Sequence, residues 1–267
     1  MAAAEHVARA RPAAVADTTR LRVWALRIAI IVVILAAWEG LAASGWLFRD
    51  VVPPLATIGR ALGKVLVSAD FYFNLGVTLG EIGVALLIGG VAGIAVGILL
   101  GANRFLAHAY ETFIYYLGPT PKIIFFPVMI MWFGVGSGSK IAMGVLSCFF
   151  PIVISTAGGM REIDQVLIRV GQSFRASWWQ MATKIYLPAM RQPIVNGVRL
   201  GLGVAIIGTL LAETKLSNRG IGYLIIQAYA TFDMPRMYAL LIVLFVLAIG
   251  ANAVIGRLGR ARSRVQA

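Results

Sequence analysis

The sequence predicts an all-α integral membrane protein with about six transmembrane helices. Of its 267 residues, 60% are hydrophobic and 13% are charged, and the mean hydropathy is +0.85, so the chain carries more apolar surface than one soluble core of this size buries. Runs such as "LLIVLFVLAIG" lack the alternation of a transmembrane barrel strand. A helix needs roughly 20 predominantly apolar residues to cross a hydrocarbon layer of ~30 Å. Six stretches have that length: residues 26–46, 75–101, 110–133, 139–158, 194–213 and 237–257.

The positive charge is distributed unevenly over these spans. The formal net charge of +13 would by itself suit a nucleic acid partner. In a six-span arrangement, however, sixteen basic residues fall on the side of the two termini and seven on the other side, while Lys122 falls inside a span. Because basic loops stay in the cytoplasm, both termini are predicted to be cytoplasmic. Basic residues near the surface also attract anionic lipid, at about 1 kcal/mol each, so no nucleic acid partner is expected.

The expected organisation is a cytoplasmic N-terminal tail (1–25), a transmembrane domain (26–258) and a short cytoplasmic C-terminal tail (259–267). The alternative for the N-terminus is a signal peptide, because "LAASGW" after the first apolar stretch is similar to a small-residue cleavage site. The length of that stretch, together with Trp38 and Glu39 inside it, favours a retained span.

The connection after the first span begins with a Pro-Pro break and continues as "LATIGRALGKVLV", which predicts a helix lying at the outer surface. Its segment "GRALGK" lacks the spacing and the Ser/Thr of a phosphate-binding loop, so no nucleotide site of that kind is expected. His6 and His108 have no metal-ligand companions at plausible spacing, so neither a metal site nor an enzyme is expected. The single cysteine, Cys148, lies in the fourth apolar stretch and is expected to serve packing.

The second span carries small residues at every fourth position. Gly89, Gly93, Gly97 and Gly101 follow this spacing inside "GGVAGIAVGILLG". Such a strip lets another helix backbone approach closely, so these glycines are predicted to pack helices. A sliding surface used in conformational change is the alternative.

The third span is interrupted by "GPTPKIIFFP". Pro121 and Pro127 each remove a backbone donor, and Lys122 costs about 2.5 to 3.5 kcal/mol in lipid on insertion scales. Broken backbone at membrane depth is tolerated where it is buried in protein or lines a cavity. Lys122 is therefore expected either to reach the interface or pair with a carboxylate such as Glu81 or Glu39, or to line a pathway.

The connection between the fourth and fifth spans, residues about 160–193, is too long and too basic for a minimal outer turn. Its apolar residues recur in helical steps at Val170, Phe174, Trp178, Met181 and Ile185, which predicts one amphipathic helix. Proline disfavours helical geometry in the residue before it, so this helix is expected to end before the proline of "YLPAM". The helix would rest on lipid or dock in a groove on a soluble partner.

The stretch "MATKIYLPAMRQPIVNGVRLGLG" resembles the cytoplasmic signature of membrane subunits of binding-protein-dependent ABC importers. That signature is usually written E-A-A, three residues, G, nine residues, I-x-L-P. Ile185, Leu187 and Pro188 match its last part, whereas positions 169–171 read "RVG" and Arg175 stands where the glycine belongs. The segments "PKIIFFPVMIMWFGVGSGSK", "WEGLAASG", "PPLATI" and "GIGYLI" resemble the nitrate, sulfonate and taurine branch, and the resemblance covers nearly all of residues 35–260.

This resemblance implies a type I ABC importer permease fold in a bacterial inner membrane. It implies a second permease subunit, identical or homologous, a pair of ATPase subunits that hold ATP and Mg, and an external binding protein that delivers the substrate. The chain itself would bind no cofactor. The residues implied in contact with the ATPase are Arg169, Val170, Gly171, Gln172, Ser173, Phe174, Arg175, Ala176, Ser177, Trp178, Ile185, Leu187 and Pro188.

The substrate stays open at this point. Pro121, Lys122, Pro127 and Glu213 are the pathway candidates, and Lys122 would suit an anion such as a sulfonate or nitrate. A pyrimidine-type vitamin precursor, carried by similar subunits, is the main alternative. An ion-coupled secondary transporter using Glu39, Glu81 and Glu213 is a further one, but no inverted repeat with paired broken helices is evident.

Overall fold

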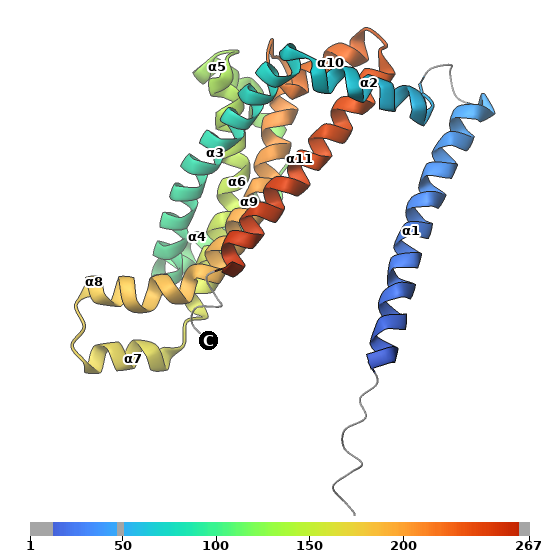
Figure 1. Ribbon diagram of the computed structural model, residues 1–267. Coiled ribbons are helices and arrows are strands. Elements are labelled where there is room, and N and C mark those ends of the chain that lie inside the picture. Colours follow the sequence, from blue (N-terminus) through green and yellow to red (C-terminus); the bar gives the residue numbers. More distant parts are fainter. Residues whose placement is uncertain (1–12, 47–50, 262–267) are drawn as a thin grey trace, which may run out of the picture. The chain divides into compact units, whose positions relative to one another are not determined.

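The structure, a computed structural model, describes residues 13–46 and 51–261 (Figure 1). The chain divides into two compact units, the first ending at Arg60 and the second beginning at Ala61. The expected tails at residues 1–12 and 262–267 lie outside the described residues. The described part is built from helices, and five of them are long and apolar enough to cross a membrane, or six if one bent pair counts as a single span.

The first unit holds one long helix, α1 (Ala13–Ser44), whose portion from Arg22 onwards can span a membrane. The helix thus begins inside residues 1–25, the segment predicted to be a cytoplasmic tail. The reason is local, since "AAVADTTRLRVWALR" contains good helix formers and no proline. Glu39 accepts a hydrogen bond at 3.0 Å from the backbone N–H of Leu55, the first residue of α2 (Leu55–Val67), and so satisfies an otherwise unpaired donor there.

The second unit is a bundle centred on three long helices: α3 (Ala69–Ala102), α6 (Ser137–Arg161) and α9 (Leu187–Lys215). In Figure 1, α11 (Met234–Ala261) runs beside α9, and the short α10 (Ile221–Ala230) lies at one end of the bundle. The hairpin of α7 (Gln165–Ser173) and α8 (Trp178–Met181) projects from the other end, which is called the hairpin end below. Where α3, α6 and α9 meet, Cys148, Ile152 and Ala205 are fully buried.

The glycine strip of α3 faces α6. A Cβ atom placed on Gly97 would lie 2.6 Å from the Cβ of Thr156 and 2.9 Å from the carbonyl oxygen of Val153, which is closer than side chains pack. Gly89, Gly93 and Gly101 meet α6 in the same way, one turn apart. Glycine at these positions therefore sets the distance between the two helix backbones.

The third predicted span is bent rather than straight. It consists of α4 (Arg104–Leu117), a 3₁₀ turn η1 (Lys122–Phe125) and α5 (Phe126–Phe133), with 93° between the two halves. The ammonium of Lys122 donates to the carbonyl oxygens of Gly118 and Thr120 and lies 5.1 Å from the ring centre of Phe150. These contacts replace the carboxylate partner that the sequence suggested for Lys122. Carbonyl oxygens at the bend thus accept hydrogen bonds from the lysine.

The fifth span begins earlier than expected, because Pro188 does not end its helix. A π-helical segment, η2 (Ala182–Tyr186), joins α8 to α9, so the helical stretch from Trp178 to Lys215 is long enough to cross a membrane. Pro188 sits in the first turn of α9, where a missing N–H costs least, and the wider π turn precedes it. The expectation of a helix end before Pro188 is therefore wrong.

Candidate functional site

The α7–α8 hairpin occupies most of the segment implied in ATPase contact. Asp164 caps α7 by accepting a hydrogen bond at 2.8 Å from the N–H of Val166. Ser177 and Gln180 form a capping box at the start of α8, with the N–H of Ser177 donating to Gln180 at 2.8 Å. The chain therefore reverses between the two helices, and the expected single helix through Val170 and Ile185 is wrong.

The reversal is a Schellman motif, which sequence reasoning missed. The N–H of Ala176 donates to the carbonyl oxygen of Gly171 at 3.0 Å, and that of Arg175 donates to Gln172 at 2.9 Å. Arg175 itself has φ 50°. This is the left-handed conformation that the motif requires and that glycine adopts without steric cost. The glycine of the family signature falls at this same position, so the signature itself was the signal that could have revealed the turn.

Gly171 allows α7 to lie close against the helix that follows. A Cβ atom at Gly171 would stand 2.5 Å from Sδ of Met181 and 2.6 Å from Cδ1 of Ile185. Gly171 and Met181 are buried, and Ile185 is half-buried. Two of the five residues predicted to share one helix face therefore pack inside the hairpin instead.

The remaining apolar residues of the hairpin are exposed. Phe174 is 83% exposed and Trp178 is 77% exposed, at the tip where the chain reverses. We call the exposed apolar residues of the hairpin the tip surface, and they are Val166, Leu167, Val170, Phe174, Trp178 and Trp179. Large exposed apolar side chains of this kind mark surfaces for a protein or membrane partner. Leu187 and Pro188, at the base of α9, are exposed but do not belong to the tip.

Replacing Arg175 with glycine is expected to stabilise the turn between α7 and α8 by about 1 kcal/mol, because it removes the cost of holding a side chain in the left-handed region. Hydrogen exchange of the amides of Arg175 and Ala176 would report this as slower exchange. Arg175→Ala keeps the unfavourable conformation and serves as the control. Equal exchange in the glycine and alanine variants would contradict the assignment of strain to this residue.

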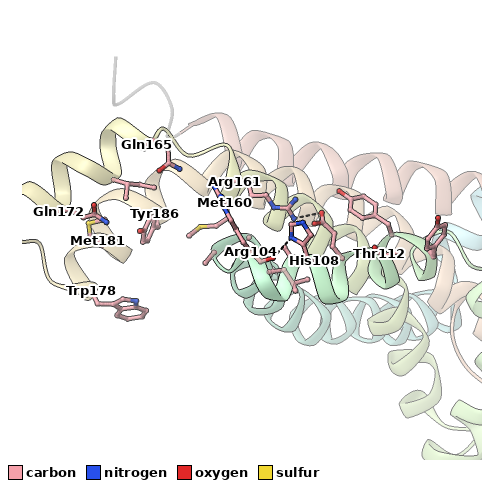
Figure 2. Close-up of a pocket in the computed structure, with 18 residues that line it drawn as sticks. Arg104, His108, Thr112, Met160, Arg161, Gln165, Gln172, Trp178, Met181 and Tyr186 are labelled. Carbon is pink, nitrogen blue, oxygen red and sulfur yellow. Dashed lines mark hydrogen bonds and ion pairs between the residues drawn. The ribbon is translucent and has the colours of Figure 1, made fainter.

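A groove of about 1230 Å³ lies at the hairpin end, bounded by the ends of α3 and α6, by α4 and by the hairpin (Figure 2). Arg161 at the end of α6 forms an ion pair at 2.7 Å with Glu111 of α4. His108 Nδ1 lies 3.0 Å from the carbonyl oxygen of Arg104, one turn earlier on α4. Gln172 lines the opposite part of the groove.

The four pathway candidates differ in burial. Pro121 and Pro127 are exposed beside the bend and Lys122 is half-buried, whereas Glu213 of α9 is fully buried at the far end from the hairpin. No hydrogen bond or ion pair within residues 13–46 and 51–261 joins Glu213 to Lys122.

Glu213 binds the first turn of α10. Its carboxylate accepts hydrogen bonds from the N–H of Gly222 at 2.6 Å and from the hydroxyl of Thr78 at 2.7 Å. Thr78 in turn accepts from the N–H of Ile221 at 2.8 Å, and Asn74 accepts from that of Gly220 at 2.7 Å. Three side chains from α3 and α9 thereby satisfy the amides at the start of α10, and a carboxylate there also matches the helix dipole.

Asn74 and Thr78 were not singled out from the sequence. The signal was present, since they are polar residues four positions apart in an apolar helix and thus share one face. Their partners 135 or more residues away were not readable from any local pattern.

A family described as "Binding-protein-dependent transport system inner membrane component" matches residues 89–264. The chain belongs to this family. It is therefore a multi-pass permease component of a binding-protein-dependent ABC importer, as the sequence predicted, and the family is a transport component rather than an enzyme.

Relatives of this permease support the predicted branch. The taurine transport system permease protein of Escherichia coli (strain K12) is 30% identical over 252 residues, which cover 90% of this chain and 91% of the relative. A putative aliphatic sulfonates transport permease protein of Bacillus subtilis (strain 168) is 29% identical over 224 residues, 84% of this chain and 81% of the relative. The formylaminopyrimidine transport permease protein of Halalkalibacterium halodurans is 28% identical over 188 residues, 70% of this chain and 75% of the relative.

A solved structure has the same fold. A chain of the MetNI methionine ABC transporter in inward-facing conformations superposes on the permease with a TM-score of 0.64 and 22% sequence identity. The match covers 73% of this chain and 99% of that chain. The prediction of an all-α, type I importer permease fold is thus confirmed.

Proposed function

We propose that this permease forms the pathway for a small organic anion, with a sulfonate as the substrate class, and that a separate ATPase drives it through the α7–α8 hairpin. An external binding protein delivers the anion, and a second permease subunit completes the pathway. ATP and Mg belong to the ATPase, and this chain binds no cofactor. Residues 26–258 form the transmembrane domain, residues 160–193 form the coupling loop, and both termini face the cytoplasm because the basic residues gather on their side.

The observation that carries the coupling role is the tip surface on a braced hairpin. The Schellman turn, the two helix caps and the close contact at Gly171 fix the hairpin, while Phe174 and Trp178 have no apolar cover. A partner that binds this tip can move it as one body. The helix that follows continues from Trp178 to Lys215 and so reaches Glu213 and the start of α10 at the opposite end.

Such a connection supports alternating access only under one condition. The nucleotide states of the ATPase must favour different positions of the hairpin, because a ligand shifts an equilibrium by its differential affinity alone. A long helix with a π-helical segment at its base offers one place for that motion, since π segments mark positions where helices adjust.

Replacing Phe174 or Trp178 with aspartate is expected to abolish co-purification of the ATPase subunit and to weaken its binding at least about thirtyfold, because a buried aromatic anchor contributes about 2 kcal/mol or more to an interface. The measurement is affinity purification from the native membrane in mild detergent, followed by an ATPase assay of the eluate. Val67, 86% exposed at the opposite end of the second unit, provides the matched control Val67→Asp.

The coupling proposal fails if all three variants retain the ATPase, or if no ATPase accompanies the unaltered protein. Equal loss in the Val67→Asp variant would also contradict it, because a general defect of the charged variants would then explain the result. Gel filtration of each purified variant verifies that the fold is intact.

We expect the binding protein to stimulate the ATPase activity of the complex when it is loaded with a sulfonate. We expect no stimulation when it is offered a vitamin precursor. Two of the relatives named above transport taurine or aliphatic sulfonates by their descriptions, and one transports formylaminopyrimidine, so these classes are the ones to compare. The measurement is ATPase activity of the reconstituted complex with its binding protein and either taurine, ethanesulfonate or formylaminopyrimidine. Stimulation by the pyrimidine alone would overturn the substrate class without touching the coupling role.

A further inference from the structure

The groove at the hairpin end carries positive charge that the permease does not neutralise. Figure 2 shows Arg104, His108 and Arg161 gathered at one end of this groove, and we call these three residues the basic cluster. The carboxylate of Glu111 is engaged by Arg161 at 2.7 Å. The guanidinium of Arg104 forms no hydrogen bond or ion pair with any described residue.

Other residues that line the groove also offer hydrogen-bond donors. Thr112, Gln165 and Tyr186 line the groove, and within the described ranges their side chains have no hydrogen-bond partner. Glu111 is the one carboxylate among the lining residues, and its charge is paired. Guanidinium groups present several N–H donors in a planar fork that matches the oxygens of sulfonate, sulfate or phosphate.

We propose that the basic cluster binds the oxyanion group of a ligand whose apolar part lies along Met160 and Met181 of the same groove. The site lies at the hairpin end, so it is distinct from the surface that would receive a substrate from outside, and it goes beyond the proposed function. Arg104 and Arg161 hold the oxyanion, while His108 and Thr112 provide further polar contacts.

The size of the groove fits two sources of this chemistry. Small-molecule pockets usually measure about 300 to 1,000 Å³. At about 1230 Å³, the groove can admit a soluble sulfonate with water, or the phosphate headgroup of an anionic lipid with part of its chain.

The test uses the full chain together with any subunits that co-purify. In the first arm, the protein is placed in nanodiscs of phosphatidylcholine and titrated calorimetrically with sodium sulfate and with ethanesulfonate. In the second, native mass spectrometry measures retention of phosphatidylglycerol against phosphatidylcholine. Saturable binding in either arm is expected, and the arm in which it occurs identifies the source of the oxyanion.

Arg104→Gln is expected to weaken that binding about tenfold, the size typical of losing a hydrogen bond to a charged group, and Arg104→Lys is expected to weaken it less. Arg257, exposed on α11 outside the groove lining, provides the matched control Arg257→Gln, which should leave binding unchanged. Absence of binding in both arms would overturn the proposal. Equal weakening in the Arg104→Gln and Arg257→Gln variants would also overturn it, because it would show general surface charge instead of a site.

Discussion

The Gly97→Leu variant is expected to lose its folded state, with a destabilisation of about 3 kcal/mol or more, because the new side chain would overlap the backbone and side chains of α6. Even a Cβ atom there would stand 2.6 Å from the Cβ of Thr156 and 2.9 Å from the oxygen of Val153. Neither neighbour is the free end of a flexible side chain, so the helices themselves would have to separate. The measurement is the yield of monodisperse protein and its thermal midpoint in detergent.

Gly80→Leu is the matched control for this experiment. Gly80 lies on the same helix outside the four-residue series from Gly89 to Gly101, and a Cβ atom there would have no neighbour within 4 Å. Leucine also has a better helix propensity than glycine, by close to 1 kcal/mol, so Gly80→Leu should fold normally. If both variants misfold, the glycine strip is needed for some reason other than its contact with α6. If both fold, the tight approach of α3 to α6 is not required.

The Glu213→Ala variant is expected to be destabilised by about 3 kcal/mol, because it leaves the N–H of Gly222 and the hydroxyl of Thr78 buried without an acceptor. The start of α10 would then detach from α3 and α9. Glu213→Gln retains one carbonyl acceptor for Gly222 and should lose considerably less. Thermal unfolding measures the difference between the two variants, and equal stability of both would show that the carboxylate does not anchor α10.

A pair of threonine variants tests the same network without changing charge. Thr78→Val removes the acceptor of the Ile221 N–H and a donor to Glu213, so a loss of about 1 to 3 kcal/mol is expected. The hydroxyl of Thr209 is equally buried but has no hydrogen-bond partner within the described chain. Thr209→Val is therefore expected to be neutral or slightly stabilising. The opposite order of stability would contradict the assigned network.

Much of the fold was predictable because each membrane helix must satisfy its own backbone and present apolar side chains to lipid. The apolar stretches located the membrane-crossing helices, and the prolines around Lys122 located the break in the third span. The signature around Ile185 and Pro188 identified the loop later seen to form the hairpin. Periodicity failed there, because apolar residues in helical steps fit one long helix as well as two short helices that pack on each other at Gly171.

The sequence by itself determined the membrane location, the helical class and the family, since these follow from composition, from the length of apolar runs and from a local signature. Only the tertiary structure decided that Arg175 is the left-handed residue of a turn, that Glu213 caps α10 with Thr78, and that Arg104 and Arg161 meet at one groove. The physical reason is that these roles depend on where distant segments place their polar groups. A hydrogen bond between residues 78 and 213 leaves no periodic trace in either segment, because each helix would form with or without it.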